Sequence, residues 1–324
     1  MSSFKRPSEI ANGINRGLER LMPIIPPLAV VMGFLLPHIF IHLRPLITLL
    51  FGLMTYSGAL KLRTREFGSV IRHPMPMILC FISIHVIMPL IAMLVSSLFF
   101  KGDSDTIAGF ILLYSGPTAV SGFIWVSMFR GDPALCLTLI LLDTMLAPLV
   151  IPGTVSILMG TKVTINMTGI AVSLCLMVVI PTILGVATNE LSRGKIPSLV
   201  TPYLSPLSKI CLAGVIAANS APIARQLHFD EPRIWGIAAL CILLAIISYM
   251  LSKLTGIAGR MNPEKQVSIF FAGGLRNISA VTTIAVDFFA QGAVLPALLG
   301  IMFQQTLAAV MGRLLMDRTA NRKI

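Results

Sequence analysis

The sequence predicts an all-α, polytopic membrane protein with ten transmembrane helices in two inverted five-helix repeats. Composition is the first reason, because 56% of the 324 residues are hydrophobic and only 12% are charged. A soluble domain carries roughly 25% charged residues, so this chain lacks the polar surface that would keep it dissolved. The second reason is a series of apolar runs, each similar in length to the helix of about 20 residues that crosses a bilayer. The third is an alternating distribution of Lys and Arg between those runs.

Charged residues or Gly and Pro bound each apolar run. The first run, from Leu21 to about Leu43, exceeds the roughly 7–15 residues of a signal-peptide core, so we expect it to be retained as a helix. The ten predicted segments are residues 22–41, 45–60, 74–99, 106–129, 133–159, 166–188, 207–224, 233–252, 266–289 and 292–312.

The basic residues predict the orientation of the chain. Of 25 Lys and Arg residues, 19 lie in the two terminal segments and the even-numbered loops, whereas five lie in the odd-numbered loops. By the positive-inside rule, both termini face the cytoplasm, and the chain spans the inner or plasma membrane in contact with lipid. Ile10, Ile14 and Leu18 recur at four-residue spacing before the first run, which fits either a short helix on the cytoplasmic surface or a basic tail.

Several functional classes are excluded by what the sequence lacks. The net charge of +12 comes from scattered residues rather than a basic patch with aromatics, so nucleic acid is not a predicted partner. The five cysteines lie in apolar runs without metal-ligand spacing. Neither an H-E-x-x-H motif nor an ATP-binding G-x-x-x-x-G-K-[ST] motif occurs, so we expect no enzyme, and any transport must draw on gradients.

Weak internal similarity predicts the inverted repeat, a common plan in transporters. Asp143 follows Gly131 by twelve residues in the fifth segment, and Gln304 follows Gly292 by the same interval in the tenth. Two halves of five helices must have opposite orientations, because five is odd. The predicted organisation is a basic segment 1–21, repeats 22–159 and 166–312, and a basic tail 313–324.

The fourth and ninth segments are interrupted at corresponding places. Pro117 lies in the middle of the fourth, and Gly273-Gly274 lie in the ninth. Proline removes a helical hydrogen bond and glycine weakens a helix, and the freed backbone groups cannot face lipid. Paired breaks of this kind point to a binding site at the midplane, although a proline kink and a glycine packing face would produce the same pattern.

Two ionisable residues lie deep in the predicted membrane. Arg276 is about eleven residues from the cytoplasmic end of its segment, hence about 16 Å deep at 1.5 Å per residue, and Asp143 reaches about 18 Å. Such residues nearly always face a cavity or a counter-ion. One interpretation is a salt bridge between them. The other is that Arg276 clamps a substrate carboxylate, which its planar fork matches, while Asp143 carries a coupling proton or cation.

Polar residues at helical spacing predict a water-filled path along the two broken segments. The alternative is that the Ser and Thr hydroxyls bond to their own helix. His85, beside Pro89, is either a titrating group or a buried histidine bonded to a neighbour. In the ninth segment the polar residues are Arg276, Ser279, Thr283 and Asp287, and in the fourth they are Thr118, Ser121 and Trp125.

Short motifs resemble the superfamily of bile acid:sodium symporters and arsenite efflux permeases. They are Thr118-Ala119, Phe123-Ile-Trp125, Arg130-Gly-Asp-Pro-Ala134, Ile87-Met-Pro89 and Asn277. The resemblance covers nearly the whole chain. It implies two broken helices that cross near the midplane, a six-helix core that moves against a four-helix panel, and sodium bound at the crossing.

The chain also departs from that family pattern. Ala272 and Arg276 stand where the bile acid symporters usually have a sodium-binding Glu and Gln, Ile84 replaces a Gln, and Ser121-Gly122 replaces Ser-Asn. Arsenite permeases have Cys at the position of Pro117 and Glu at that of Ser279. The resemblance therefore implies that arsenite is not the substrate and that fixed positive charge has replaced a bound cation.

The sequence thus predicts a secondary active transporter of a small organic anion, a carboxylate, that works by alternating access. One alternative is a sodium-coupled symporter that retains a cation site, and another is a non-transporting membrane ligand sensor. The predicted substrate-binding residues are Arg276, Asn277, Ser279, Thr118, Ser121, Gln304 and Asn219. The predicted coupling residues are Asp143 and Thr283, with protons or sodium as the coupling ion. A sodium site, if present, would comprise Thr118, Ser121, Asp143 and Asn277.

Overall fold

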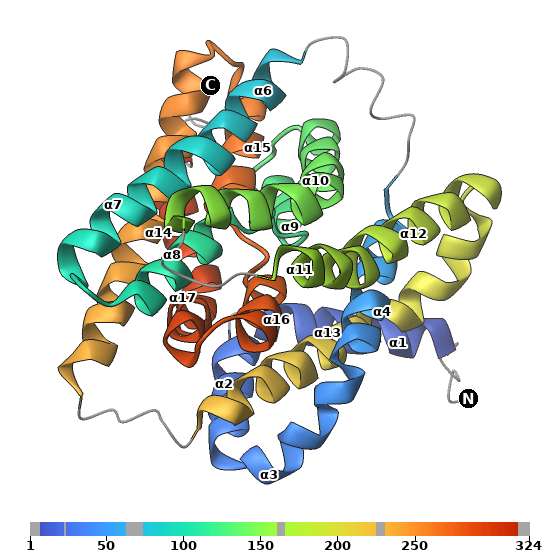
Figure 1. Cartoon of the computed structure of the whole chain (residues 1–324). Coiled ribbons are helices and arrows are strands. Elements are labelled where there is room, and N and C mark those ends of the chain that lie inside the picture. The colour runs from blue at the N-terminus through green and yellow to red at the C-terminus, as the bar shows by residue number, and fades with distance from the viewer. Residues whose placement is uncertain (1–6, 23, 63–73, 161–165, 225–230, 317–324) are drawn as a thin grey trace. The chain divides into compact units, whose positions relative to one another are not determined.

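The chain folds into helices (Figure 1). Its residues divide into two compact units. The computed structural model describes residues 7–22, 24–62, 74–160, 166–224 and 231–316, and no strand occurs among them. Unit 1 comprises Met1–Thr64 and Cys175–Arg225, and unit 2 comprises Arg65–Leu174 and Gln226–Ile324. Each unit therefore contains chain from both predicted repeats, because a repeat describes chain order whereas a unit describes packing. The inverted repeat itself stays a prediction.

Unit 1 is organised around one long helix, α13, which packs against α1, α2 and α4. A Cβ atom at Gly33 of α2 would lie 2.4 Å from the backbone oxygen of Ala217, so glycine allows the α2 and α13 backbones to approach closely. The basic segment before the first apolar run forms α1, and Lys209 of α13 bonds to its Asn15. The elements are α1 (Pro7–Leu21), α2 (Ile25–Leu35), α3 (Pro37–Phe40), η1 (Ile41–Leu46), α4 (Ile47–Ala59), η5 (Cys175–Val179), α12 (Ile180–Leu191), α13 (Lys195–Ser220) and η6 (Ala221–Ile223).

Unit 2 contains both interrupted segments. Its helix α14 packs against α15 and α17, and α8 packs against α7 and α17. The elements are α6 (Met75–Ile82), η3 (Ser83–Ile87), α7 (Met88–Phe99), α8 (Ser104–Ser115), α9 (Gly122–Met128), α10 (Pro133–Met159), α11 (Met167–Leu174), α14 (Pro232–Ala258), α15 (Pro263–Gly274), α16 (Ile278–Phe288) and α17 (Gln291–Leu315).

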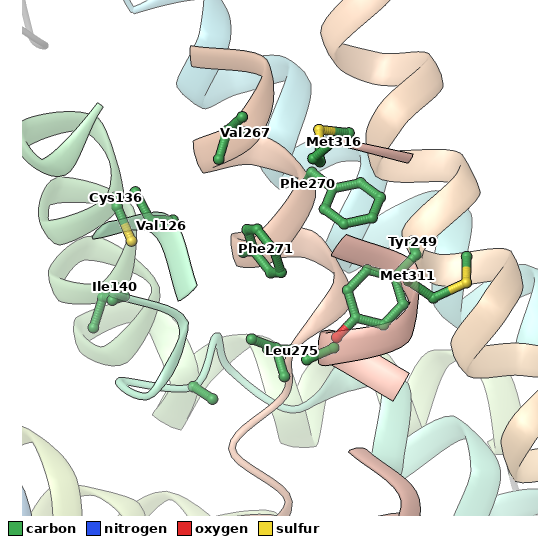
Figure 2. Close-up of a cluster of buried hydrophobic side chains, with 12 residues drawn as sticks. Val126, Cys136, Ile140, Tyr249, Val267, Phe270, Phe271, Leu275, Met311 and Met316 are labelled. Atoms are coloured by element: carbon green, nitrogen blue, oxygen red, sulfur yellow. The ribbon is translucent and has the colours of Figure 1, made fainter. Parts of the chain in front are cut away.

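An apolar cluster holds α15 in place within unit 2. Figure 2 shows Phe270 and Phe271 of α15 between side chains of α9 and α10 and side chains of α14 and α17. The ring of Tyr249 lies 5.0 Å from that of Phe270, centroid to centroid. Burying this much aromatic surface is a large favourable contribution to folding. The cluster anchors α15 just before the chain leaves the helix.

Among the described residues, seven helices are long and apolar enough to cross a membrane. The predicted first, fourth and ninth segments are shorter pieces, because Pro37 ends α2 early and the other two are broken. The count of ten transmembrane helices therefore stays a prediction, while an all-helical membrane fold is confirmed. The seven spans are Pro37–Ala59, Met75–Phe99, Pro133–Met159, Met167–Leu191, Lys195–Ile223, Pro232–Ala258 and Gln291–Leu315.

The seventh predicted segment begins too late. We expected it to start at residue 207, but α13 starts at Lys195 and contains Pro202 and Pro206 within the helix. Proline suggested a helix boundary, yet membrane helices tolerate it because neighbouring groups satisfy the freed carbonyls. The long helix α13 thus includes a stretch that we interpreted as a loop.

A π-helical turn, η3, interrupts the third predicted segment at Ser83–Ile87. The N–H of Met88 bonds to the carbonyl of Ser83, five residues earlier, and Pro89 follows without an N–H of its own. Such π-turns inside α-helices occur frequently at functional sites. Here the turn carries His85.

Candidate functional site

The first break separates α8 from α9. Helix α8 ends at Ser115 and α9 begins at Gly122, so Thr118 lies in non-helical chain. Pro117 explains the break, because it offers no N–H to continue α8. Our prediction that Thr118, Ser121 and Trp125 share one helical face is therefore wrong for Thr118.

The second break separates α15 from α16. Leu275 has extended backbone angles, Asn277 is the N-cap of α16, and Arg276 lies between them. The Asn277 side chain accepts a hydrogen bond from the N–H of Ala280 at 3.3 Å, a common way to begin a helix. Our prediction that Arg276 shares a helical face with Ser279 and Thr283 is therefore wrong, because the cap starts the helix after it.

The two breaks bond to each other through their backbones. Thr118 and Arg276 form an isolated antiparallel bridge. The N–H of Ala119 donates to the carbonyl of Leu275 at 3.1 Å, and the N–H of Asn277 donates to the carbonyl of Pro117 at 2.7 Å. These bonds satisfy the backbone groups that the helices leave free, as a buried site requires.

Asp143 of α10 is fully buried and binds the first break. Its Oδ2 accepts hydrogen bonds from the N–H and the hydroxyl of Thr118, both at 2.7 Å. Its Oδ1 lies 2.6 Å from Nε2 of His85, and only 9% of the histidine side chain is exposed. The Thr118 hydroxyl also lies 3.1 Å from the carbonyl of Ala272, but its single proton can serve only one of the two acceptors. Both carboxylate oxygens therefore have protein partners.

Arg276 is 2% exposed and belongs to the second break. Its backbone N–H donates to Oε1 of Gln304 at 3.0 Å, and its Nη2 makes a long hydrogen bond of 3.5 Å to the carbonyl of Ile84. Its Nε and Nη1 have no hydrogen-bond partner among the described residues. Asp143 lies within electrostatic reach of Arg276, but its side chain contacts His85 and Thr118, so the salt bridge between Asp143 and Arg276 that the sequence left open does not form.

A small cavity of about 20 Å³ adjoins Arg276. A cavity needs about 10–15 Å³ to hold one water molecule, so this one admits about one and excludes a carboxylate substrate. The hydroxyl of Tyr249, another lining group, has no hydrogen-bond partner in the described part of the chain. The cavity is lined by Leu113, Tyr114, Cys241, Ala245, Tyr249, Gly274, Arg276, Ile278, Gly300, Phe303, Gln304 and Leu307.

Of the other predicted site residues, some lie beside the two breaks and others lie away from them. The Ser121 hydroxyl accepts from Nε2 of Gln305 at 3.3 Å, beside the break. Ser279 and Thr283 are buried in α16, and the Thr283 hydroxyl donates to the carbonyl of Ser279 at 3.0 Å, in line with the local-bonding alternative. Asn219 is buried in α13 and belongs to unit 1, whereas Arg276 belongs to unit 2.

The predicted set omitted two residues. His85 attracted attention in the sequence, but nothing there named Asp143, 58 residues away, as its partner. Gln305 gave no signal, yet its side chain joins Ser121 to Nε1 of Trp125, which lies 3.0 Å from the Gln305 oxygen. The sequence shows that both residues are polar among apolar neighbours, but only the fold identifies their hydrogen-bond partners.

Known proteins resemble the chain along most of its length. Residues 48–228 match the family described as the sodium bile acid symporter family. The chain is 38% identical over 294 residues to the uncharacterized protein YbaS of Bacillus subtilis, covering 91% of this chain and 96% of that one. It is 24% identical over 268 residues to the uncharacterized sodium-dependent transporter YocS of the same bacterium, covering 82% of each. The arsenical-resistance protein Acr3 of Alkaliphilus metalliredigens is 24% identical over 184 residues, covering 52% of this chain and 51% of that one.

Proposed function

The chain belongs to the sodium bile acid symporter family, and on that premise we propose that it carries a small organic anion across the membrane, with Arg276 as the carboxylate clamp. Membership confirms the resemblance found in the sequence and makes the protein a membrane transporter rather than an enzyme. Positive charge in the terminal segments and even-numbered loops supports an inner or plasma membrane location with both termini in the cytoplasm.

The guanidinium of Arg276, two of whose three nitrogens have no hydrogen-bond partner among the described residues, is the observation that carries the proposal. A charged group in the membrane interior costs about 2.5–3.5 kcal/mol on insertion scales and normally has a partner. Arg276 is 2% exposed, and its Nε and Nη1 have none among the described residues. A carboxylate accepts two parallel N–H bonds from Nη2 together with either Nε or Nη1, so an anionic substrate would supply an acceptor that the protein lacks.

Alternating access is consistent with the size of the cavity beside Arg276. At about 20 Å³ it has no room for a carboxylate, so the site must open before a substrate reaches the guanidinium. Gln304, which holds the Arg276 backbone, would keep the clamp in position, and Thr118, Ser121 and Asn277 would surround the opened crossing.

A sodium-coupled symporter is the second candidate. The family description and the name of YocS favour it, and the cation site would comprise Thr118, Ser121, Asp143 and Asn277. Sodium requires several oxygen ligands, whereas Asp143 already has both oxygens engaged by His85 and Thr118. Transport that requires sodium at constant pH would support this second candidate.

Counterflow in proteoliposomes tests the clamp. We expect Arg276→Gln to reduce exchange of radiolabelled monocarboxylates by about 10- to 100-fold, because each hydrogen bond to a charged group is worth about 1.5–3 kcal/mol. Arg233→Gln is the matched control, because it makes the same change in the exposed pair with Asp103. Thermal unfolding in detergent would verify that both variants fold. Undiminished exchange by folded Arg276→Gln would exclude the clamp.

A further inference from the structure

A cavity of about 460 Å³ lies within unit 1. It is bordered by α1, the turn after α4, the end of α12 and the first three turns of α13. Small-molecule sites typically measure about 300–1,000 Å³, so this cavity has the size of a ligand site. The residues that line it are Asn12, Asn15, Leu60, Lys61, Asn189, Gly194, Pro197, Ser198, Thr201, Pro202 and Ser205.

Two hydroxyls of α13 line this cavity and have no hydrogen-bond partner among the described residues. They belong to Thr201 and Ser205, one helical turn apart, and Ser205 is only 7% exposed. Ser and Thr inside a helix often donate to a carbonyl of the preceding turn, and Ser198 does so to Lys195 at 2.7 Å. Because buried polar groups normally have partners, the two free hydroxyls indicate a ligand that accepts hydrogen bonds.

The charge at the cavity is positive. Lys61 lines it, is exposed, and forms no ion pair in the described part of the chain. The nearby cation Lys209 already has a counter-ion, because its Nζ lies 3.4 Å from the carboxylate of Glu19. None of the described residues that line the cavity is Asp or Glu. A lysine ammonium is a compact charge with three donors and commonly binds phosphate, so the cavity favours an anionic ligand of this kind.

The cavity also offers hydrogen-bond acceptors. Pro202 has no N–H, so the carbonyl of Ser198, four residues earlier, has no donor from the next turn of α13. Nδ2 of Asn189 donates to the carbonyl of Leu62 at 2.8 Å, which leaves Oδ1 of Asn189 as an acceptor. A ligand that combines an anionic phosphate with hydroxyl groups would match both kinds of lining group.

The predicted orientation places this cavity at the cytoplasmic surface of the membrane. Lys61 and Gly194 belong to even-numbered loops, which the distribution of Lys and Arg assigns to the cytoplasm. Helix α1 exposes the apolar side chains of Ile14 and Leu21, by 53% and 49%, as helices in the membrane interface do. Anionic lipids are found at this surface, and basic pockets between helices bind their headgroups.

We propose that this cavity binds a glycerophosphate group, with Lys61 paired to the phosphate. The hydroxyls of Thr201 and Ser205 donate to the phosphate oxygens, and the carbonyl of Ser198 accepts a glycerol hydroxyl. Two sources carry this chemistry, the headgroup of an anionic phospholipid such as phosphatidylglycerol and a soluble glycerol phosphate. The site belongs to unit 1, and the inference does not depend on the anion clamp at Arg276 of unit 2.

Calorimetric titration of the full-length protein in a neutral maltoside detergent tests the site. The titrants are dihexanoyl phosphatidylglycerol, dihexanoyl phosphatidylcholine and sn-glycerol 3-phosphate. We expect phosphatidylglycerol to bind at least about tenfold more tightly than phosphatidylcholine, and Lys61→Gln to remove this difference. Lys265→Gln is the matched control, because it removes a lysine charge from unit 2 at the same predicted face of the membrane.

Ser205→Ala separates binding from structure. The Ser205 hydroxyl has no partner in the described part of the chain, so its loss should leave thermal unfolding of the unliganded protein unchanged. Binding of phosphatidylglycerol should weaken by about three- to tenfold. Ser208→Ala is the matched control, because the Ser208 hydroxyl bonds to the carbonyl of Leu204 at 2.7 Å and does not line the cavity. It should leave binding unchanged.

The soluble titrant identifies the source of the group. Binding that Lys61→Gln weakens supports the site, whether the lipid, the soluble ester or both bind. Binding of phosphatidylglycerol alone assigns the site to the membrane, and binding of glycerol phosphate alone assigns it to a soluble ligand. Equal affinity of wild type and folded Lys61→Gln for each titrant, or no binding of any titrant, would overturn the proposal.

Discussion

The two breaks of unit 2 bond to each other through their backbones but have opposite electrostatics. In the first, the N–H of Thr118 bonds to a carboxylate, Asp143, whose other oxygen contacts His85. In the second, the N–H of Arg276 bonds to a neutral amide, Gln304, and two guanidinium nitrogens have no partner among the described residues. The protein completes the first break by itself and leaves the second incomplete. An incomplete buried cation is the feature that a substrate anion would complete.

Asp143 and Gln304 each accept a backbone N–H of one break, and replacing each of them by Leu would test the comparison most strongly. Asp143→Leu leaves Nε2 of His85 and the N–H of Thr118 without their acceptor and removes the negative charge near Arg276, so we expect a loss of about 3–5 kcal/mol in the free energy of unfolding. Gln304→Leu removes one neutral acceptor from a backbone N–H and should cost about 1–3 kcal/mol. Thermal unfolding in detergent, followed by a dye that labels the buried free cysteines, measures both.

The paired variants control for each other, because both place the same apolar side chain next to a break. Equal losses of stability would mean that charge plays no part in holding the first break. Asp143→Asn refines the result, since it keeps an acceptor for Thr118 and removes only the charge. We expect its stability to lie between those of wild type and Asp143→Leu.

We expect a smaller difference in stability between alanine variants of the two glycines that flank the breaks. A Cβ at Gly274, the last residue of α15, would lie 2.1 Å from a ring carbon of Tyr249, whose ring packs against Phe270. At Gly122, the first residue of α9, it would meet nothing closer than 3.7 Å. We expect Gly274→Ala to lower stability by about 1–3 kcal/mol through overpacking, and Gly122→Ala to change it by less than about 1 kcal/mol. The same unfolding assay compares them, and equal effects would contradict the packing in Figure 2.

The exposed ion pair at the start of α8 provides the weakest test. Partial burial would raise the pKa of Asp103, but hydrogen bonds from Thr106 and the Arg233 guanidinium outweigh it and lower the pKa below its ordinary value. The carboxylate therefore adds stability above the unfolded-state pKa of about 3.9, and this is lost as pH falls through the lower folded pKa. We expect Asp103→Asn to cost less than about 1 kcal/mol near neutral pH, and the cost to disappear in acid and shrink in high salt. A larger cost that persists at low pH would mean that Asp103 acts through packing.

Part of the fold followed from periodicity and composition. The prediction of residues 133–159 coincides with α10, and that of 74–99 nearly coincides with α6 to α7. Pro117 and Gly273-Gly274 correctly indicated two interruptions. The start of α13 was missed, because a proline has the same sequence signal at a helix boundary and inside a membrane helix.

Most residues of the candidate site could be predicted from the sequence, but the hydrogen bonds between them could not. Equal twelve-residue spacings selected Asp143 and Gln304, and the structure places each on the backbone N–H of a different break. The depth calculation placed Asp143 and Arg276 at similar levels and left a salt bridge between them open. Depth is one coordinate, however, and the π-turn η3 brings His85 to Asp143 instead.

The sequence by itself determined that this protein is a helical membrane transporter, because apolar length, charge asymmetry and family motifs are properties of the chain read in order. It also determined that Arg276 faces the protein interior or a cavity, since a charged residue in the middle of an apolar segment is too costly to expose to lipid. Only the tertiary structure decided which charges pair. Pairing depends on contacts between residues far apart in the chain, and a π-turn or a helix cap of a few residues changes the direction of a side chain without changing the hydrophobic pattern.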